Sequence, residues 1–188
     1  MERHFDEELT ELNKQLLRMS SLVEEAICVS IKALVEREDD LASEVIKRDE
    51  TINMLEIEID ELCLRLLALY QPKAIDLRFI TAAMKINNDL ERIADQAVNI
   101  AERTQEIIKQ PLLKPLIDIS RMATIAQKMV KDSIDALVNK DEALARDVCK
   151  RDDEVDNLND QVFRELPAIW NDFRASFIFL LLTCKNRV

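Results

Sequence analysis

The chain of 188 residues contains no glycine, and this absence limits the folds available to it. Glycine supplies the positive φ angles on which tight β-hairpins and phosphate-cradling loops depend. A chain without it has neither a P-loop nor the GxGxxG dinucleotide-binding motif. Only four prolines are present, so turns are few. The sequence therefore predicts an all-α protein with short helix junctions made by Pro, Asn and Asp.

The charge of the chain restricts its partners. The 26 Lys and Arg residues against 37 Asp and Glu residues leave a formal net charge of −11 at pH 7. Most of such a surface would repel the phosphate groups of nucleic acids and anionic lipids. We therefore expect no nucleic-acid binding, and we expect basic protein surfaces or cations as partners.

Three features indicate a cytoplasmic protein. The N-terminal residues show no cationic segment followed by an apolar run, so no signal peptide is expected. The longest apolar run, Phe177–Leu182, is too short to span a bilayer. The four cysteines are scattered without a CxxC pair, which is typical of buried thiols in a reducing compartment.

Apolar residues recur every three or four positions along most of the chain, which predicts amphipathic helices. The first series includes Phe5, Leu9, Leu12 and Leu16. Prolines mark several ends of the helical segments. The predicted helices cover residues 5–36, 39–70, 74–108, 115–139 and 141–166. Because the connections are short, neighbouring helices should pack antiparallel in an up-down bundle.

The chain also contains an internal repeat. After a shift of 103 residues, 12 of the 26 positions from 30 to 55 carry the same residue as positions 133 to 158. Lys47-Arg48-Asp49, for example, falls on Lys150-Arg151-Asp152. About two matches would occur by chance at ordinary residue frequencies. The chain is therefore a tandem duplication of a helical unit.

The second unit is expected to be incomplete. The first unit, 1–108, has three predicted helices, and a linker over 109–116 separates it from the second unit, 117–188. By the repeat, a sixth helix would run from about 177 to 211, but the sequence ends at 188. We expect two tandem three-helix bundles, the second of which lacks a normal sixth helix and carries a divergent tail over 167–188.

Carboxylates gather along one face of the predicted third helix. At about 100° per residue, Glu91 and Asp95 lie one turn apart and nearly opposite the apolar residues Leu90 and Ile93. Further carboxylates and amides in this pattern are Asp49, Asn53 and Glu56 on the second helix and Asp152 and Asp156 on the fifth.

Two interpretations of this pattern are open. Carboxylates three or four residues apart are common on helices, and most of them form a solvated face with nearby Lys or Arg. Here the neighbours along the face are Asn and Glu rather than Lys, and like charges one turn apart are unfavourable without a counter-charge. If the second and third helices are neighbours, their carboxylates can share one oxygen-only site. Such a site favours hard cations such as Mg²⁺, Mn²⁺, Ca²⁺ or Fe³⁺.

The segment from Asn88 to Ile100, NDLERIADQAVNI, closely resembles the E/DxxxD motif of the PhoU family of bacterial phosphate-signalling regulators. Gln71-Pro72 followed by Asp76-Leu77-Arg78, and Asp49 followed by Ile52-Asn53, also resemble that family. The similarity covers about 1–166 and includes the two-repeat layout. It implies two three-helix bundles related by a pseudo-twofold axis.

The resemblance also implies metal ligands, because some members of the family bind iron or zinc clusters at paired E/DxxxD motifs. The implied cofactors here are Fe, Zn, Mg or Mn ions, without an organic cofactor. The implied ligands are Asp49, Glu91 and Asp95 with Asn53 beside them, and Asp152 and Asp156 as one half of a second site.

The tail from Pro167 to Val188 does not resemble the sixth helix of the family. The partner carboxylates expected near 194–198 are absent, which places the second metal site in question. A shifted reading frame or a natural truncation would explain the difference. The uncovered apolar stripes of the fourth and fifth helices would then need a cover. A short helix of the tail or a second chain would provide one, and we expect a homodimer.

Catalysis is not expected. His4 is the only histidine, so Ser/His/Asp and Cys/His arrangements and the Glu-x-x-His pairs of di-iron oxidases cannot form. The resemblance implies a negative regulator of the phosphate-starvation response. Such an adaptor links the Pst phosphate ABC transporter, through its ATPase subunit, to the phosphate-sensing histidine kinase, and contacts the membrane only through these partners. The alternatives are a metal-carrying enzyme or store, and a helical oligomerisation module.

Overall fold

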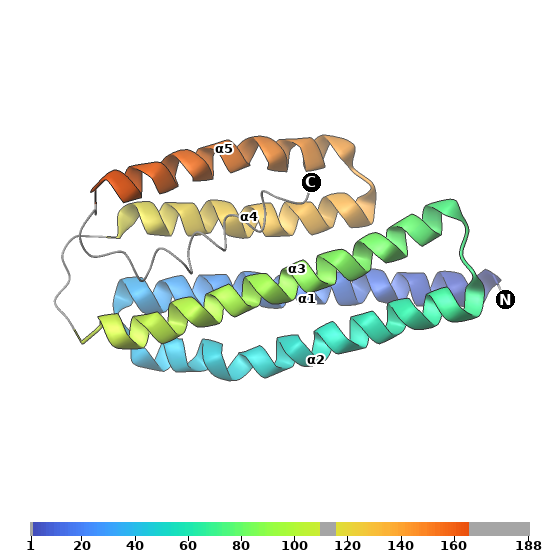
Figure 1. Ribbon diagram of the computed structural model, residues 1–188, viewed down its shortest axis with the longest axis horizontal. Coiled ribbons are helices and arrows are strands. Elements are labelled where there is room, and N and C mark those ends of the chain that lie inside the picture. Colours follow the sequence, from blue (N-terminus) through green and yellow to red (C-terminus); the bar gives the residue numbers. More distant parts are fainter. Residues whose placement is uncertain (1, 110–115, 166–188) are drawn as a thin grey trace.

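The computed structural model describes residues 2–109 and 116–165, and five α-helices account for nearly all of them (Figure 1). No strand occurs in these two ranges. The prediction of an all-α chain is confirmed, and each helix begins and ends within three residues of its predicted limit. The helices are α1 (Glu2–Glu36), α2 (Asp39–Tyr70), α3 (Ala74–Ile107), α4 (Ile117–Asn139) and α5 (Glu142–Glu165).

Helices α1, α2 and α3 pack on one another as a three-helix bundle around an apolar core. Their apolar spacing explains the packing, because residues three and four apart fall on one face of a helix. Leu12, Leu16 and Met19 of α1 are fully buried there, as are Ile59 and Leu66 of α2. Burying one such side chain contributes about 1.5–3 kcal/mol, so this stripe is the main source of stability.

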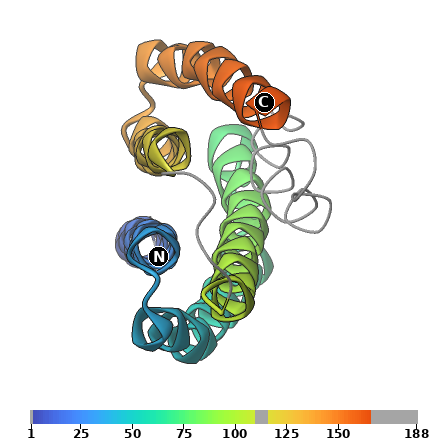
Figure 2. The ribbon, with the colours of Figure 1, turned by 90° about the vertical axis from the view of Figure 1, so that its left-hand side faces the viewer.

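Helix α4 joins the second unit to the first, because it packs against both α5 and α1. Figures 1 and 2 show α4 beside α1 and antiparallel to it, with α5 on the far side of α4. At this contact the side-chain amide of Gln127 donates a hydrogen bond of 3.0 Å to the backbone carbonyl of Glu24. The two residues are separated by 103 positions, the offset of the repeat. Equivalent points of the two units therefore meet, as expected near a pseudo-twofold axis.

Three helix ends place a non-glycine residue in the left-handed backbone region. The φ angles are 61° at Arg37, 46° at Gln71 and 55° at Lys140. The junctions after α2 and α4 contain Pro72 and Asp141, in line with the prediction, but the left-handed position of each junction is occupied by another residue type. A left-handed conformation costs a residue with a Cβ atom about 1–2 kcal/mol, and the chain tolerates this cost at three places.

The first and fourth helices end in the same way, one repeat apart. The amide of Glu38 donates to the carbonyl of Ala33 at 3.0 Å, and the amide of Asp141 donates to the carbonyl of Ala136 at 2.8 Å. Each bond spans six residues around the left-handed position, as in a Schellman motif. The repeat therefore extends from sequence to backbone conformation.

The tail predicted to diverge, 167–188, lies outside the described residues, as does most of the predicted linker. In the ranges that are described, no helix combines the length and the apolar character needed to cross a membrane.

Candidate functional site

Helices α2 and α3 carry the four residues predicted for the first site, and the two helices pack side by side. Along α2, the side-chain amide of Asn53 donates to Oδ2 of Asp49 at 2.9 Å. On α3, Glu91 and Asp95 lie one turn apart. Glu91 is partly buried, whereas Asp95 is exposed. The residues therefore share the outward side of the α2–α3 pair.

The carboxylates on this side of α2 and α3 affect one another electrostatically. Burial raises the pKa of Glu91, and the charges of Asp95, Glu56 and Asp49 raise it further, whereas Arg92 lowers it. Burial also raises the pKa of Asp95, and the charge of Asp49 adds to this effect. The negative charge of Asp49 on α2 therefore acts on both carboxylates of α3, Glu91 and Asp95. The condition set for a shared site, that the second and third helices are neighbours, is met, and the shared site itself stays a prediction.

A buried amide fixes the register of the two helices. The side chain of Asn87, which is fully buried, donates from Nδ2 to the backbone carbonyl of Glu56 at 2.8 Å. Because the helices are antiparallel, this bond places the carboxylate-bearing part of α2 beside that of α3. Asn87 was not among the predicted site residues, although it occupies a position of the apolar stripe between Ala83 and Leu90.

Two buried oxygens of the site have no hydrogen-bond partner in the described structure, namely Oδ1 of Asp49 and Oδ1 of Asn53. A buried oxygen without a donor is costly, and a cation would relieve this cost. Carboxylate and amide oxygens are the ligands that hard cations prefer. Within residues 2–109 and 116–165, however, no three His, Cys, Asp or Glu side chains converge closely enough to hold a metal ion. The oxygen ligands are of the kind that hard cations prefer, but the carboxylates do not converge on one point.

The pair predicted for the second site, Asp152 and Asp156, lies on α5, which packs against α4. Both residues are partly buried. The resemblance would place their partner carboxylates on a sixth helix, and residues 166–188 are not among those described. Of the six predicted ligands, the four of the first repeat lie on the neighbouring helices α2 and α3.

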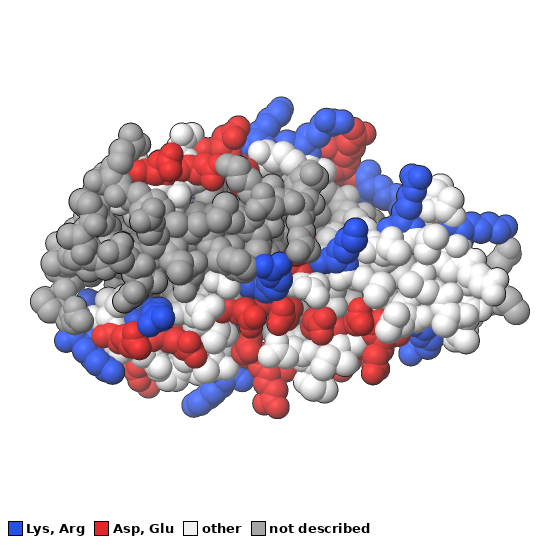
Figure 3. Space-filling model, viewed as in Figure 1, with Lys and Arg blue, Asp and Glu red and all other residues white. Residues whose placement is uncertain are grey.

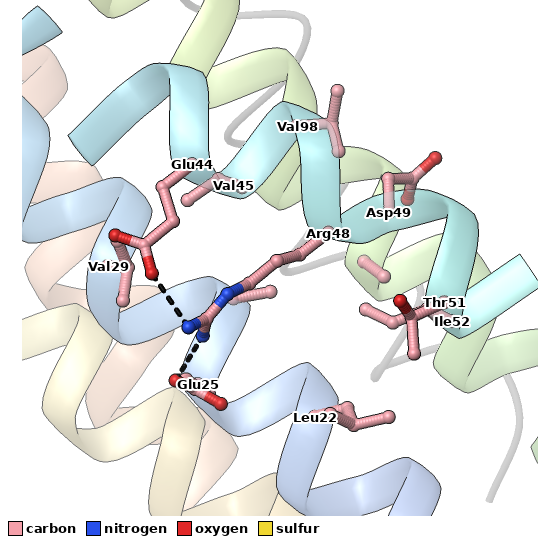
Figure 4. Close-up of a pocket in the computed structure, with 12 residues that line it drawn as sticks. Leu22, Glu25, Val29, Glu44, Val45, Arg48, Asp49, Thr51, Ile52 and Val98 are labelled. Atoms are coloured by element: carbon pink, nitrogen blue, oxygen red, sulfur yellow. Dashed lines mark hydrogen bonds and ion pairs between the residues drawn. The ribbon is translucent and has the colours of Figure 1, made fainter. Parts of the chain in front are cut away.

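A pocket of about 270 Å³ opens among α1, α2 and α3, and Asp49 of the candidate site is one of the residues that line it (Figure 4). Arg48 reaches across it, with an ion pair to Glu25 of α1 and another of 2.7 Å to Glu44. Asp49 follows Arg48 on α2 and points in another direction, away from Glu25 (Figure 4). The apolar lining residues are Leu22, Ala26, Val29, Val45, Ile52, Ala94 and Val98.

This arginine bridge was not predicted. The repeat contained a signal for it, because Arg48 and Arg151 occupy equivalent positions in the two units. Arg151 likewise joins two helices, through an ion pair of 2.6 Å with Asp132 of α4. The arginines connect neighbouring helices within a unit, which is a structural role.

Comparison with known proteins gives a consistent result. The family model described as "PhoU domain" matches residues 16–104 and 119–181. The second match continues beyond residue 166, where the resemblance was expected to end. A "Phosphate-specific transport system accessory protein PhoU homolog" of Aquifex aeolicus is 46% identical over 159 residues, which cover 85% of this chain and 72% of the relative. A relative of the same name from Clostridium acetobutylicum is 37% identical over 185 residues, covering 96% of this chain and 84% of the relative.

Solved structures agree with this assignment. The crystal structure of PhoU from Pseudomonas aeruginosa matches with a TM-score of 0.85 at 33% identity, covering 95% of this chain and 89% of that one. The regulatory protein PhoU of the phosphate transport system from Streptococcus pneumoniae matches with a TM-score of 0.83 at 26% identity, covering 95% and 87%. The family model, the relatives and the fold together show that the chain belongs to the PhoU family.

Proposed function

We propose that this chain is an accessory protein of a phosphate-specific transport system and a negative regulator of the phosphate-starvation response. It would link the ATPase subunit of the transporter to the phosphate-sensing histidine kinase and would inhibit signalling by the kinase when phosphate is plentiful. The observation that carries the proposal is the similarity to relatives named as accessory proteins of phosphate-specific transport. The chain would act by binding, on the cytoplasmic side of the membrane, and not by catalysis.

The charge distribution supports a binding role. Four carboxylates, Asp49, Glu56, Glu91 and Asp95, lie near one another on α2 and α3. The whole chain carries a formal net charge of −11. A surface of this kind attracts basic partner surfaces, and the association should weaken as salt increases.

We also propose that a cation binds the α2–α3 side through Asp49, Asn53, Glu91 and Asp95. The two unpaired buried oxygens and the raised pKa of Glu91 support this proposal. Fe, Zn, Mg and Mn are the candidate ions, and a bound ion would neutralise the repelling carboxylates. In the second unit, Asp152 and Asp156 would supply one half of a second site.

The regulatory proposal is tested in a bacterium that lacks its own PhoU protein and carries a phosphate-starvation reporter. The chain should restore low reporter activity at high phosphate and should capture the ATPase subunit and the kinase in pull-downs. Failure of both measurements would overturn the proposal. Light scattering of the purified chain tests the expected homodimer.

The metal proposal has a separate test. Elemental analysis should find metal in the purified chain, and the Glu91→Gln/Asp95→Asn double variant should lose it. Glu58→Gln, which removes an exposed carboxylate elsewhere on α2, should retain it. Metal-dependent turnover without partner capture would favour an enzyme or store, and the absence of both metal and partners would favour an oligomerisation module.

A further inference from the structure

The chemical character of the outward side of α2 and α3 changes along the length of the two helices. Near the turn between the two helices it presents apolar side chains, among which Leu64 is 51% exposed and Leu77 is 42% exposed. Toward the middle of the helices it presents carboxylates. We call this side the α2–α3 face. Its apolar half consists of Leu64, Leu67, Leu77 and Met84, and its acidic half consists of Asp49, Glu56, Glu91 and Asp95.

The helix geometry places these residues on one side. Leu77, Met84 and Glu91 are seven residues apart on α3, which is close to two full turns, so they form one continuous row. The hydrogen bond between Asn87 and Glu56 fixes the antiparallel register of the neighbouring helix. Leu64 lies eight residues after Glu56 on α2, and Leu77 lies ten residues before Asn87 on α3. The apolar residues of the two helices are therefore at about the same level.

Figure 3 shows the two halves on the surface of the molecule. Asp and Glu side chains form a row over the middle of α2 and α3, and an uncharged area follows toward the end at which these two helices meet (Figures 1 and 3). Leu67 and Met84 are partly buried and pack against the core, so they form the floor of the apolar half. Exposed apolar side chains that cluster, rather than occurring singly, mark interaction sites.

We propose that the α2–α3 face binds an amphipathic helix of a protein partner, with apolar residues along one half and Lys or Arg along the other. This inference rests on the proposed accessory function and specifies the chemistry of the partner. From Asp49 to Leu67 the face extends about 27 Å at 1.5 Å per residue. A partner helix that spans this length has about five turns.

Charge decides between the classes of occupant. The acidic half already gathers four carboxylates on two helices that pack side by side, and like charges in such proximity repel one another. A second copy of this chain would bring the same carboxylates to the contact. Nucleic acid or anionic lipid would bring phosphates. A helix with Lys or Arg over the acidic half is the occupant that lowers this repulsion, and its apolar half covers Leu64 and Leu77.

The first experiment measures binding of a synthetic probe to the full chain by calorimetry, in buffer with a chelator so that metal plays no part. The probe is an 18-residue helical peptide with a Leu/Ile stripe in one half and Lys in the other, and a matched peptide has Glu in place of Lys. Leu64→Glu and Leu77→Glu should each weaken binding of the Lys peptide about tenfold. Glu91→Gln/Asp95→Asn should weaken it and reduce its salt dependence.

Leu17→Glu is the matched control, because Leu17 is 37% exposed but lies on α1. It should bind the Lys peptide as well as the unaltered chain does, and circular dichroism should show every variant to be folded. The inference is overturned if Leu17→Glu weakens binding as much as Leu64→Glu, or if the Glu peptide binds equally well. It is also overturned if Leu64→Glu abolishes self-association of the chain, because a second copy then occupies the face.

Pull-downs separate this inference from the proposed function. If the unaltered chain captures the transporter ATPase subunit or the kinase and Leu64→Glu/Leu77→Glu does not, the docking face is supported. If that double variant captures them undiminished, the face is overturned while the proposed function stands. If the unaltered chain captures neither partner, the proposed function fails, and the peptide titration decides the docking face by itself.

Discussion

The two helical units place an arginine at the same position of the repeat but expose it differently. In the first unit, Arg48 pairs with Glu25 of α1 and, at 2.7 Å, with Glu44 one turn earlier on α2. The Arg48 side chain is 53% exposed and that of Glu25 is 51% exposed. Ion pairs at this exposure are solvated and screened, and they are worth about 0–1 kcal/mol.

In the second unit, Arg151 pairs with Asp132 of α4 at 2.6 Å and with Asp147 one turn earlier at 3.1 Å. The Arg151 and Asp132 side chains are only 18% and 16% exposed. Removing one partner of such a pair leaves a charge largely withdrawn from water, which is far more costly than breaking an exposed pair. The same pattern of bonds can therefore have a different energetic value, depending on how the helices cover it.

The largest expected effects come from the leucines at matched core positions, Leu55 and Leu158. Leu55 is 2% exposed within the bundle of α1, α2 and α3, and Leu158 is 7% exposed on α5. Leu55→Ala should lower the free energy of unfolding by about 3–4 kcal/mol and Leu158→Ala by about 2–3 kcal/mol, because each creates a cavity. Urea unfolding followed by circular dichroism measures both.

Leu64→Ala, on the exposed side of α2, is the control for these variants and should change stability by less than about 0.5 kcal/mol. An equal or larger loss for Leu158→Ala would mean that the second unit is packed as tightly as the first. That result would contradict the looser packing of the second unit that the greater exposure of Leu158 indicates.

The next largest effect tests the arginine comparison directly. Asp132→Asn should lower the free energy of unfolding by about 2 kcal/mol, because it leaves the Arg151 charge with only the exposed Asp147. Glu25→Gln, which removes the corresponding partner of Arg48, should cost less than about 1 kcal/mol. Both are measured by urea unfolding at low and high salt, and only the Glu25→Gln effect should fade at high salt. Equal losses for the two variants would contradict the role of burial.

A smaller effect concerns the matching helix ends at Arg37 and Lys140. Lys140→Gly should raise the free energy of unfolding by about 0.5 kcal/mol, since relief of the left-handed conformation slightly exceeds the entropy that glycine loses on folding. Arg37→Gly should give no gain, because Arg37 also donates a hydrogen bond of 2.7 Å to the carbonyl of Ile108. Thermal unfolding measures both variants. Stabilisation by Arg37→Gly equal to that by Lys140→Gly would show that this hydrogen bond contributes little.

The smallest effect concerns the carboxylates of the first unit. The pKa of Glu91 is raised above its ordinary value of 4.5, so the folded chain holds that proton more tightly than the unfolded chain does. The free energy of unfolding should therefore fall as the pH rises from below 4.5 through the raised pKa of Glu91, and ionised Glu91 destabilises the folded chain at pH 7. Glu91→Gln should stabilise the metal-free chain at pH 7 by a few tenths of a kcal/mol.

The stabilisation by Glu91→Gln should disappear below about pH 4, where Glu91 is protonated in both states. Urea unfolding at several pH values in the presence of a chelator measures it, with Glu58→Gln as the control on α2. Destabilisation by Glu91→Gln at pH 7 would mean that the acidic half gains a stabilising partner that outweighs the repulsion.

Much of the fold was predictable because the information is local. The spacing of Leu12, Leu16 and Met19 predicted the apolar stripe of α1, and all three are fully buried. Pro72 predicted the end of α2, which occurs at Tyr70. The left-handed conformations at Gln71 and Lys140 were not predictable from residue type, and at Lys140 the turn is closed by backbone hydrogen bonds to Leu137 and Ala136 of α4.

The candidate site was predictable in part. The outward placement of Glu91 and Asp95 follows from 100° per residue, and their closeness to Asp49 follows once α2 and α3 are neighbours. Asn87 was missed because a buried amide is recognised by its partner, the carbonyl of Glu56, which is 31 residues away in the sequence. Hydropathy patterns do not report such distant pairs.

By itself, the sequence determined the helices, the repeat and the face on which each carboxylate lies, since all three depend on residue spacing along one chain. Tertiary structure alone decided which of two equivalent ion pairs is the less exposed, at Arg151 rather than Arg48. It also decided that the carboxylates of α2 and α3 crowd one another beside an apolar surface. The physical reason is that burial and electrostatic repulsion depend on which helices pack side by side, and spacing along a single helix carries no information about its neighbours.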